Sequence, residues 1–140
     1  FFLDEVTALA AGHRPCFECR RADARAFAEA VAAGLGLASR PSAPEMDNRL
    51  HEERLEGRGK RRYLADIAAL PHGAVIEIDG RALAVRGERL LGWEPEGYVR
   101  SADRPAGGQV TVLTPPLMLA ALKAGYRPLW HENAVAGQPD

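Results

Sequence analysis

The sequence has few of the features that mark membrane, secreted or disulfide-rich proteins. Only 2 of its 140 residues are cysteines, so no disulfide framework is expected. It has no apolar run of about 18 residues, which excludes an ordinary transmembrane helix. The first residues contain neither a basic segment nor a long apolar stretch, so we expect no signal peptide and a cytoplasmic location. Because the chain starts at Phe1 rather than at Met, we also expect natural residues upstream.

The common catalytic motifs are missing as well. There is no Gly-x-Ser-x-Gly nucleophile elbow, no glycine-rich phosphate loop ending in Lys-Ser/Thr, and no dinucleotide-binding glycine pattern after a predicted strand. His51 and Glu52 begin a His-Glu-x-x-His zinc motif, but Leu55 stands where the second histidine is needed. The sequence therefore identifies no reaction by its motifs.

What is present is an ordinary composition for a globular protein. Apolar residues make up 46% of the chain and charged residues 26%, and the mass of 15.1 kDa fits a single domain over residues 1–140. The formal net charge is −1. This balance argues against binding a polyelectrolyte through overall charge, but it allows a local basic patch.

Residues 1–70 show the periodicity of helices. Asp4 is expected to cap a first helix that Gly12 ends, and Ser42 with Glu45 forms the capping-box pattern of a third. The expected helices cover residues 4–11, 20–33 and 43–55, with Gly34 and Gly36 ending the second. A flexible basic loop is expected at 57–62, and one or two helical turns at 63–70.

Residues 74–135 change to the period of strands. An Asp79-Gly80 turn between two apolar runs predicts a hairpin of residues 74–78 and 82–85. Further strands are expected at 89–93 and 110–113, and a last helix runs from after Thr114 through Ala124. The order predicts an α+β fold, with three to four helices packed on a small antiparallel β-meander.

The two cysteines, Cys16 and Cys19, form a Cys-x-x-Cys pair. Two thiolates on one turn are half of a tetrahedral zinc site, and His13 is near enough in sequence to be a third ligand. The same spacing at a helix start also suits a redox pair, because the helix dipole lowers the pKa of a thiol. The third interpretation is that both are small, half-buried residues without chemistry.

The segment around this pair has a family resemblance. Ala10-Ala11-Gly12-His13-Arg14-Pro15-Cys16-x-x-Cys19-Arg20 resembles the second half of the zinc-binding domain of the Ada DNA-methylation-repair proteins. The resemblance implies that Cys16 and Cys19 are two of four zinc thiolates. His13 stands at the family's aromatic position, and Arg21 stands where the family usually has proline. The family's earlier cysteine pair, which includes the methyl acceptor, has no counterpart, so methyl transfer is not implied. The rest of the chain resembles an uncharacterised bacterial protein family.

A second candidate site lies on the predicted third helix. Asp47, His51 and Arg54 are spaced i, i+4 and i+7, so they share one face beside the apolar stripe of Met46 and Leu50. An aspartate can orient a histidine, and an arginine can bind a carboxylate or phosphate with two hydrogen bonds. This combination suits general-base or anion chemistry. The alternative is a polar network on the surface of the helix.

Basic residues gather in two segments, one near the cysteines and one near residue 60. If the fold brings them together, they form a positive face that contacts the phosphates of DNA or RNA. The alternative is a solvated surface with internal ion pairs. The candidate nucleic-acid-binding residues are Arg14, Arg20, Arg21, Arg25, Lys60, Arg61 and Arg62.

One short repeat is visible. Residues 7–15 resemble residues 120–128, and each copy contains a helix end, a glycine and an Arg-Pro exit. We interpret the repeat as the same helix-stop chemistry used twice, with duplication as the alternative.

Three functions are consistent with these patterns. The preferred one is a cytoplasmic, nucleic-acid-associated binding module in which a metal ion, zinc, fixes the cysteine turn and presents the neighbouring arginines. The second is an enzyme whose Asp47, His51 and Arg54 act on a substrate with a phosphate or carboxylate group. The third is an interaction domain without a site.

Overall fold

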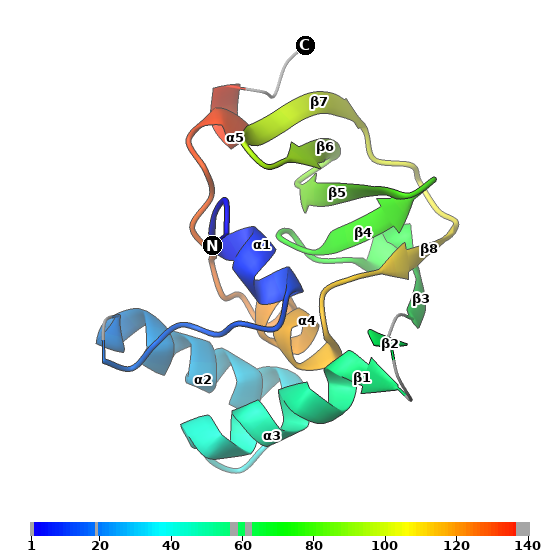
Figure 1. Ribbon diagram of the computed structural model, residues 1–140. Coiled ribbons are helices and arrows are strands. Elements are labelled where there is room, and N and C mark those ends of the chain that lie inside the picture. Colours follow the sequence, from blue (N-terminus) through cyan, green and yellow to red (C-terminus); the bar gives the residue numbers. More distant parts are fainter. Residues whose placement is uncertain (1, 19, 57–58, 61–62, 137–140) are drawn as a thin grey trace.

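The α+β prediction is confirmed by the computed structural model, which describes residues 2–18, 20–56, 59–60 and 63–136 (Figure 1). None of the described helices is long and apolar enough to span a membrane. The helices are α1 (Glu5–Ala10), α2 (Arg21–Leu35), α3 (Ala43–Arg54), α4 (Pro116–Lys123) and α5 (Asn133–Ala136), and Ile67–Ala69 forms a short 3₁₀ turn, η1.

Six of the described strands form one antiparallel sheet in the order β3-β8-β4-β5-β6-β7. They are β3 (Tyr63–Asp66), β4 (Val75–Ile78), β5 (Arg81–Arg86), β6 (Arg89–Glu94), β7 (Gly97–Asp103) and β8 (Gln109–Val112). Strands β4 to β6 form the predicted meander, β7 extends it, and β8 returns to pair with both β4 and β3. A separate two-stranded hairpin, β1 (Leu55–Glu56) with β2 (Gly59–Lys60), follows α3 directly.

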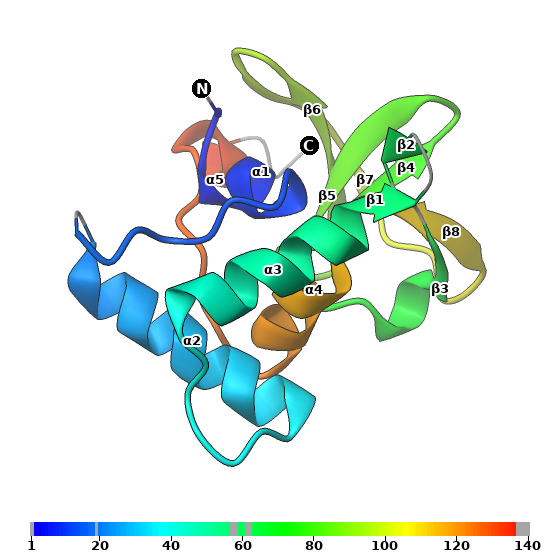
Figure 2. The same ribbon diagram turned by 60° about the horizontal axis from the view of Figure 1, so that its bottom comes forward.

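Figures 1 and 2 show how the helices are arranged relative to the sheet. Helix α1 contacts β4, and α4 lies between the sheet and the pair of α2 and α3. The chain between α1 and α2, which carries the cysteines, crosses the same side of the molecule as α3 (Figure 2). The two candidate sites of the sequence are therefore neighbours in the fold.

Three apolar clusters hold these layers together. The first joins α2, α3 and α4 through Phe27, Val31, Met46, Leu50, Leu117 and Met118. Neighbouring residues of one strand enter different clusters, as the alternation of a strand requires. Ile76 joins Ile67, Val85, Leu90 and Val112 in the second, and Val75 joins Val6, Ala84, Leu91 and Tyr98 in the third.

Local signals placed several elements correctly. The Asp4 side chain accepts a hydrogen bond from the Thr7 N–H at 3.0 Å, and the Thr7 side chain completes a capping box at the start of α1. In the hairpin turn, Asp79 and Gly80 have φ angles of 52° and 77°, as a turn with two left-handed residues requires. Ser42 and Glu45 exchange the predicted capping hydrogen bonds at the start of α3.

Three expectations about the elements are wrong. Residues 63–66 form β3 instead of a helical turn, because they pair with β8; Leu64 is 65% exposed while its neighbours point inward. Strand β7 was not expected, and it forms by pairing with β6. Gly34 does not end α2 but lies within it, and the helix ends at Gly36, which has a left-handed φ of 69°. Of the predicted loop at 57–62, only residues 59–60 are described, as β2.

Gly34 gives the first prediction, because it allows the close approach of α2 to α4. A Cβ atom built on Gly34 would lie 2.3 Å from the carbonyl oxygen of Ala120. We expect Gly34→Ala to lower the free energy of unfolding by about 2–3 kcal/mol, since a backbone atom must move. This loss exceeds the roughly 1 kcal/mol that alanine contributes to a helix over glycine. Urea unfolding measures the change.

The matched control is Ala33→Gly, the reverse substitution at the neighbouring exposed position of α2. It should cost only the difference in helix propensity, roughly 1 kcal/mol. If Gly34→Ala stabilises the protein, the close contact between the helices does not limit this position.

Candidate functional site

The cysteine turn begins at the rigid end of α1. The Gly12 N–H donates to the Leu9 carbonyl at 2.9 Å, and the His13 N–H donates to the Ala8 carbonyl at 2.9 Å. With a φ of 88° at Gly12, this is a Schellman stop. The same pair of bonds ends α4, where the Gly125 N–H donates to Leu122 and the Tyr126 N–H to Ala121. The sequence repeat is therefore matched by the same helix-stop geometry at both places.

Cys16 is exposed and lies in a tight turn directly before α2. The Glu18 N–H donates to the Cys16 Sγ at 3.4 Å, and the Arg20 N–H donates to the Cys16 carbonyl at 2.9 Å. A hydrogen bond to the sulfur favours the thiolate form, as does the nearby start of a helix. Cys19 lies outside the described residues. In the described part of the turn, one backbone N–H is therefore directed at the sulfur.

His13 has a neighbour other than the cysteine. Its exposed ring lies against the Phe2 ring, with 4.8 Å between the centroids and 51° between the planes. Among the described residues, no group of three or more His, Cys, Asp or Glu side chains is arranged to hold a metal ion. The sequence spacing of Cys16 and Cys19 fits half of a zinc site, and of the two only Cys16 is described. His13 would need to leave Phe2 to become a third ligand.

Arg14 ties the cysteine turn to α3. Its guanidinium forms a two-pronged ion pair with Asp47, with Nε–Oδ1 at 2.8 Å and Nη2–Oδ2 at 2.9 Å. The hydrogen bond to Asp47 raises the pKa of Arg14; burial opposes this rise, and the charge of Asp47 adds to it. The Arg14 side chain is 18% exposed, and its ion pair with Asp47 connects the cysteine turn to α3.

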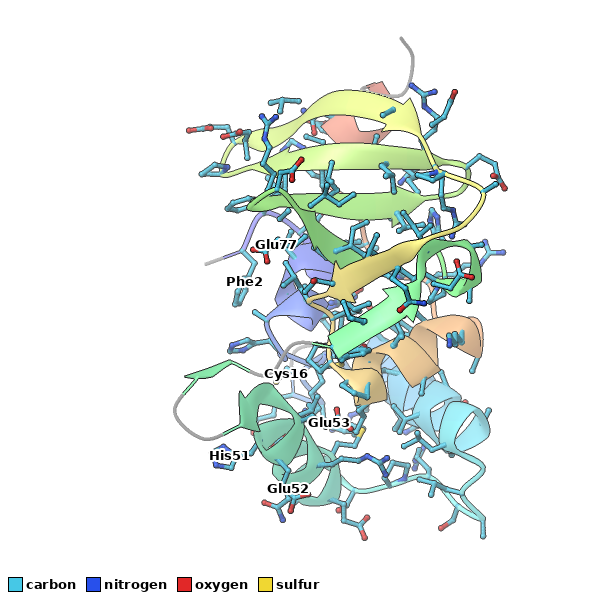
Figure 3. All side chains as sticks on the ribbon, turned by 90° about the vertical axis from the view of Figure 1, so that its right-hand side faces the viewer. Phe2, Cys16, His51, Glu52, Glu53 and Glu77 are labelled. Atoms are coloured by element: carbon cyan, nitrogen blue, oxygen red, sulfur yellow. The ribbon has the colours of Figure 1, made fainter. Side chains whose placement is uncertain are left out.

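The residues of the predicted polar face of α3 have different surroundings. Asp47 pairs with Arg14 across 33 positions of sequence, while His51 is exposed on the outer side of the helix (Figure 3). Glu52 also projects outward there, whereas Glu53 faces the body of the molecule (Figure 3). Arg54 ends α3, and its side chain lies outside the description. A three-residue catalytic site on this face remains a prediction.

The candidate nucleic-acid-binding residues separate into two classes. Arg14 and Arg20 have carboxylate partners, since Arg20 binds Glu5 at 2.9 Å and Asp23 at 2.7 Å. Arg21 and Arg25 are exposed on the first turns of α2, four residues apart and hence on one face. Lys60 lies in β2 and its side chain is not described; Arg61 and Arg62 fall outside the described residues.

Sequence reasoning missed the carboxylate that anchors this region, Glu5. It is 8% exposed and accepts hydrogen bonds from Arg20 Nη1 at 2.9 Å, the Tyr126 hydroxyl at 2.7 Å and the Leu129 N–H at 2.9 Å. Burial, and then the hydrogen bond to Glu5, raises the pKa of Tyr126. The only signal in the sequence was the position of Glu5 in the first turn of a helix, where acidic residues are common.

Glu53 was missed in the same way. It is 8% exposed, accepts from the Leu117 N–H at 2.8 Å in the first turn of α4, and pairs with Arg49 at 3.1 Å. A carboxylate at the N-terminus of a helix satisfies an N–H that lacks a partner within the helix. Glu53 therefore fixes α3 on α4, and through α4 it orients the helix that bears Asp47.

Comparisons with known protein families, characterised proteins and solved structures give no significant match to this chain.

Glu5 gives the second prediction. We expect Glu5→Gln to lower the free energy of unfolding by roughly 1–3 kcal/mol at pH 7, because an amide replaces the charged acceptor of a buried set of donors. Urea unfolding and the near-ultraviolet circular dichroism of Tyr126 would report the change.

Glu29→Gln is the matched control for this substitution. Glu29 also pairs with an arginine, but it is 63% exposed and its Oε2 lies 3.7 Å from Arg40. A surface pair of this kind contributes about 0.5 kcal/mol or less. Equal effects of the two substitutions would contradict an anchoring role for Glu5.

Proposed function

We propose that this protein is a cytoplasmic, nucleic-acid-associated binding module, in which zinc on Cys16 and Cys19 stabilises the turn that precedes α2. The observation that carries the proposal is the turn at Cys16, where the Glu18 N–H donates to the sulfur at 3.4 Å. Zinc binds thiolates, and such a hydrogen bond stabilises a thiolate.

The surroundings of the turn also favour a bound cation on sulfur. The turn is held at Gly12 by the end of α1, at Arg14 by Asp47 and at Arg20 by Glu5. A fixed turn lowers the entropy cost of bringing two thiolates to one ion. Zinc would supply structural crosslinking in this site, with Cys16 and Cys19 as ligands and His13 as the candidate third.

Exposed arginines beside the turn support the nucleic-acid part of the proposal. Arg21 and Arg25 follow the cysteines on one face of α2, and no described carboxylate forms a salt bridge with either. Lysine and arginine side chains that lack internal partners are the groups that contact phosphates. The overall charge of −1 limits the interaction to this local face.

Metal content gives the third prediction. Purified protein should contain about one zinc ion per chain by elemental mass spectrometry, and Cys16→Ser or Cys19→Ser should remove it and lower the melting temperature. His13→Ala should weaken zinc binding, measured by competition with a chromophoric chelator.

His51→Ala is the control for the histidine substitution. His51 is exposed on α3, and its removal should leave the zinc content unchanged. Absence of zinc from the unaltered protein, with no change of stability in Cys16→Ser, would overturn the metal part of the proposal. Zinc loss in His51→Ala would transfer the site to α3.

Salt dependence of nucleic-acid binding gives the fourth prediction. We expect the protein to bind DNA or RNA oligonucleotides with an affinity that falls as salt rises. Combining Arg21→Gln with Arg25→Gln should weaken binding and reduce the slope of log K against log salt by about 1.8 for duplex DNA. Fluorescence anisotropy over a salt series measures both quantities.

The matched control removes two positive charges elsewhere. Arg81 on β5 and Lys123 on α4 are both exposed. The double variant Arg81→Gln and Lys123→Gln should bind with nearly unchanged affinity and slope. Equal losses in the two double variants would show that binding follows net charge, and no binding at low salt would reject the nucleic-acid partner.

A further inference from the structure

Two buried nitrogen donors at one place in the fold have no hydrogen-bond partner. They are Nη1 of Arg86, at the end of β5, and the indole Nε1 of Trp130, in the segment after α4. The Arg86 guanidinium carbon lies 4.7 Å from the centroid of the Trp130 ring, so the two donors belong to one cluster. Buried polar groups normally have a partner, and leaving one unpaired costs about 1–3 kcal/mol.

A pocket of about 520 Å³ opens beside Trp130. His72 and Arg127 supply its polar wall, and Leu122 and Pro128 supply an apolar wall. The His72 and Trp130 ring centroids are 5.0 Å apart. No acidic side chain is among the described residues that line this pocket. Tyr126 also lines it, and its hydroxyl donates to Glu5.

The polar groups around the pocket are donors. The Gly87 N–H donates to Nδ1 of His72 at 3.0 Å, so the proton of the neutral imidazole is on Nε2. Burial lowers the pKa of His72, and Arg86, Arg104 and Arg127 lower it further, which keeps the ring neutral at pH 7. Arg127 lines the pocket and Arg86 packs against Trp130, so positive charge is concentrated at this place.

The three arginines differ in how their donors are used. Arg104 donates to the carbonyl oxygens of Ile67, Leu70 and Gly87 at 2.7–3.0 Å, so it serves the backbone of the loops. Arg86 has an unpartnered Nη1, and Arg127 is exposed at the pocket with no described ion pair. Arg127 therefore retains donor capacity for a ligand in the pocket, whereas Arg86 is buried against Trp130 and contributes its charge.

We propose that this pocket binds a small organic anion, whose carboxylate or phosphate oxygens accept from Arg127 and from the Nε2–H of His72, while Arg86, packed against the Trp130 ring, adds positive charge. Donors without acceptors and a concentrated positive charge select an oxyanion head group. The wall of Leu122 and Pro128 selects an apolar body attached to it. This site is separate from the cysteine turn and does not depend on zinc or nucleic acid.

The experiment uses the Trp93→Phe variant, in which Trp130 is the only tryptophan of the chain. Its single indole N–H signal in a ¹⁵N-correlated NMR spectrum then reports on the pocket. Hexanoate and hexyl phosphate are titrated as the two head groups, and 1-hexanol is the neutral control. We expect both anions to shift the indole signal with saturation and 1-hexanol to leave it in place.

Substitutions at the arginines test the assignment. Arg127→Met, at an exposed position, should weaken anion binding about tenfold or more, as the loss of a charged hydrogen bond predicts. Arg86→Met should weaken it less, because it removes a nearby charge and no direct contact. Arg81→Met removes a charge from the exposed start of β5 and should leave the affinity unchanged. If Arg86→Met does not fold by circular dichroism, Arg127→Met alone decides.

Three results would overturn the proposal. One is the absence of any indole shift with either anion, and another is an equal shift with 1-hexanol, which would show an apolar pocket without anion selectivity. The third is an equal loss of affinity in Arg127→Met and Arg81→Met, which would show a response to net charge. A shift by only one of the two anions supports the site and assigns its head group.

Discussion

The buried carboxylate of Glu5 is the interaction on which the arrangement of this protein depends. It accepts hydrogen bonds from Arg20 before α2, from Tyr126 after α4 and from Leu129 in the C-terminal segment. These donors are 15 to 124 positions away in the sequence. A carboxylate out of water is stable only when its acceptor sites are filled, so one residue fixes three segments together. The neighbouring Asp4 adds bonds to the Tyr98 hydroxyl and the His131 N–H.

Local chemistry made part of the fold predictable, and distant pairing made the rest inaccessible. The capping residue Asp4 and the Asp79-Gly80 turn act within a few residues, so their patterns are readable. Strand β3 forms because β8 offers it a partner more than forty positions later, and no local pattern reports that. The candidate site divides in the same way. The exposure of Arg21 follows from its helix, whereas the pairing of Arg14 with Asp47 requires the tertiary fold.

The two Schellman stops explain why both proposed sites follow a helix end. Gly12 and Gly125 reverse the chain with the same hydrogen bonds, and an Arg-Pro pair leaves each stop in an extended direction. The first exit leads to Cys16 and the second to Trp130. Glu5 binds both of these segments, because it accepts hydrogen bonds from the Arg20 guanidinium after the first helix end and from the Leu129 N–H after the second. The rigid Arg-Pro segment after each helix end fixes the direction of the side chains that follow it. A short segment can therefore position site residues without a long helix or strand.

The distribution of acidic residues determines which arginines can act on a ligand. Glu5, Asp47 and Asp23 are used by Arg14 and Arg20, so these arginines position the backbone. Among the described residues, the arginines without a carboxylate partner include Arg21 and Arg25 on the face of α2 and Arg86 and Arg127 around Trp130. A protein with a net charge of −1 can therefore keep two positive surfaces, because its carboxylates are paired internally beside one of them and absent from the lining of the other. For an anionic partner, the position of the positive charges on the surface therefore matters more than the net charge of the chain.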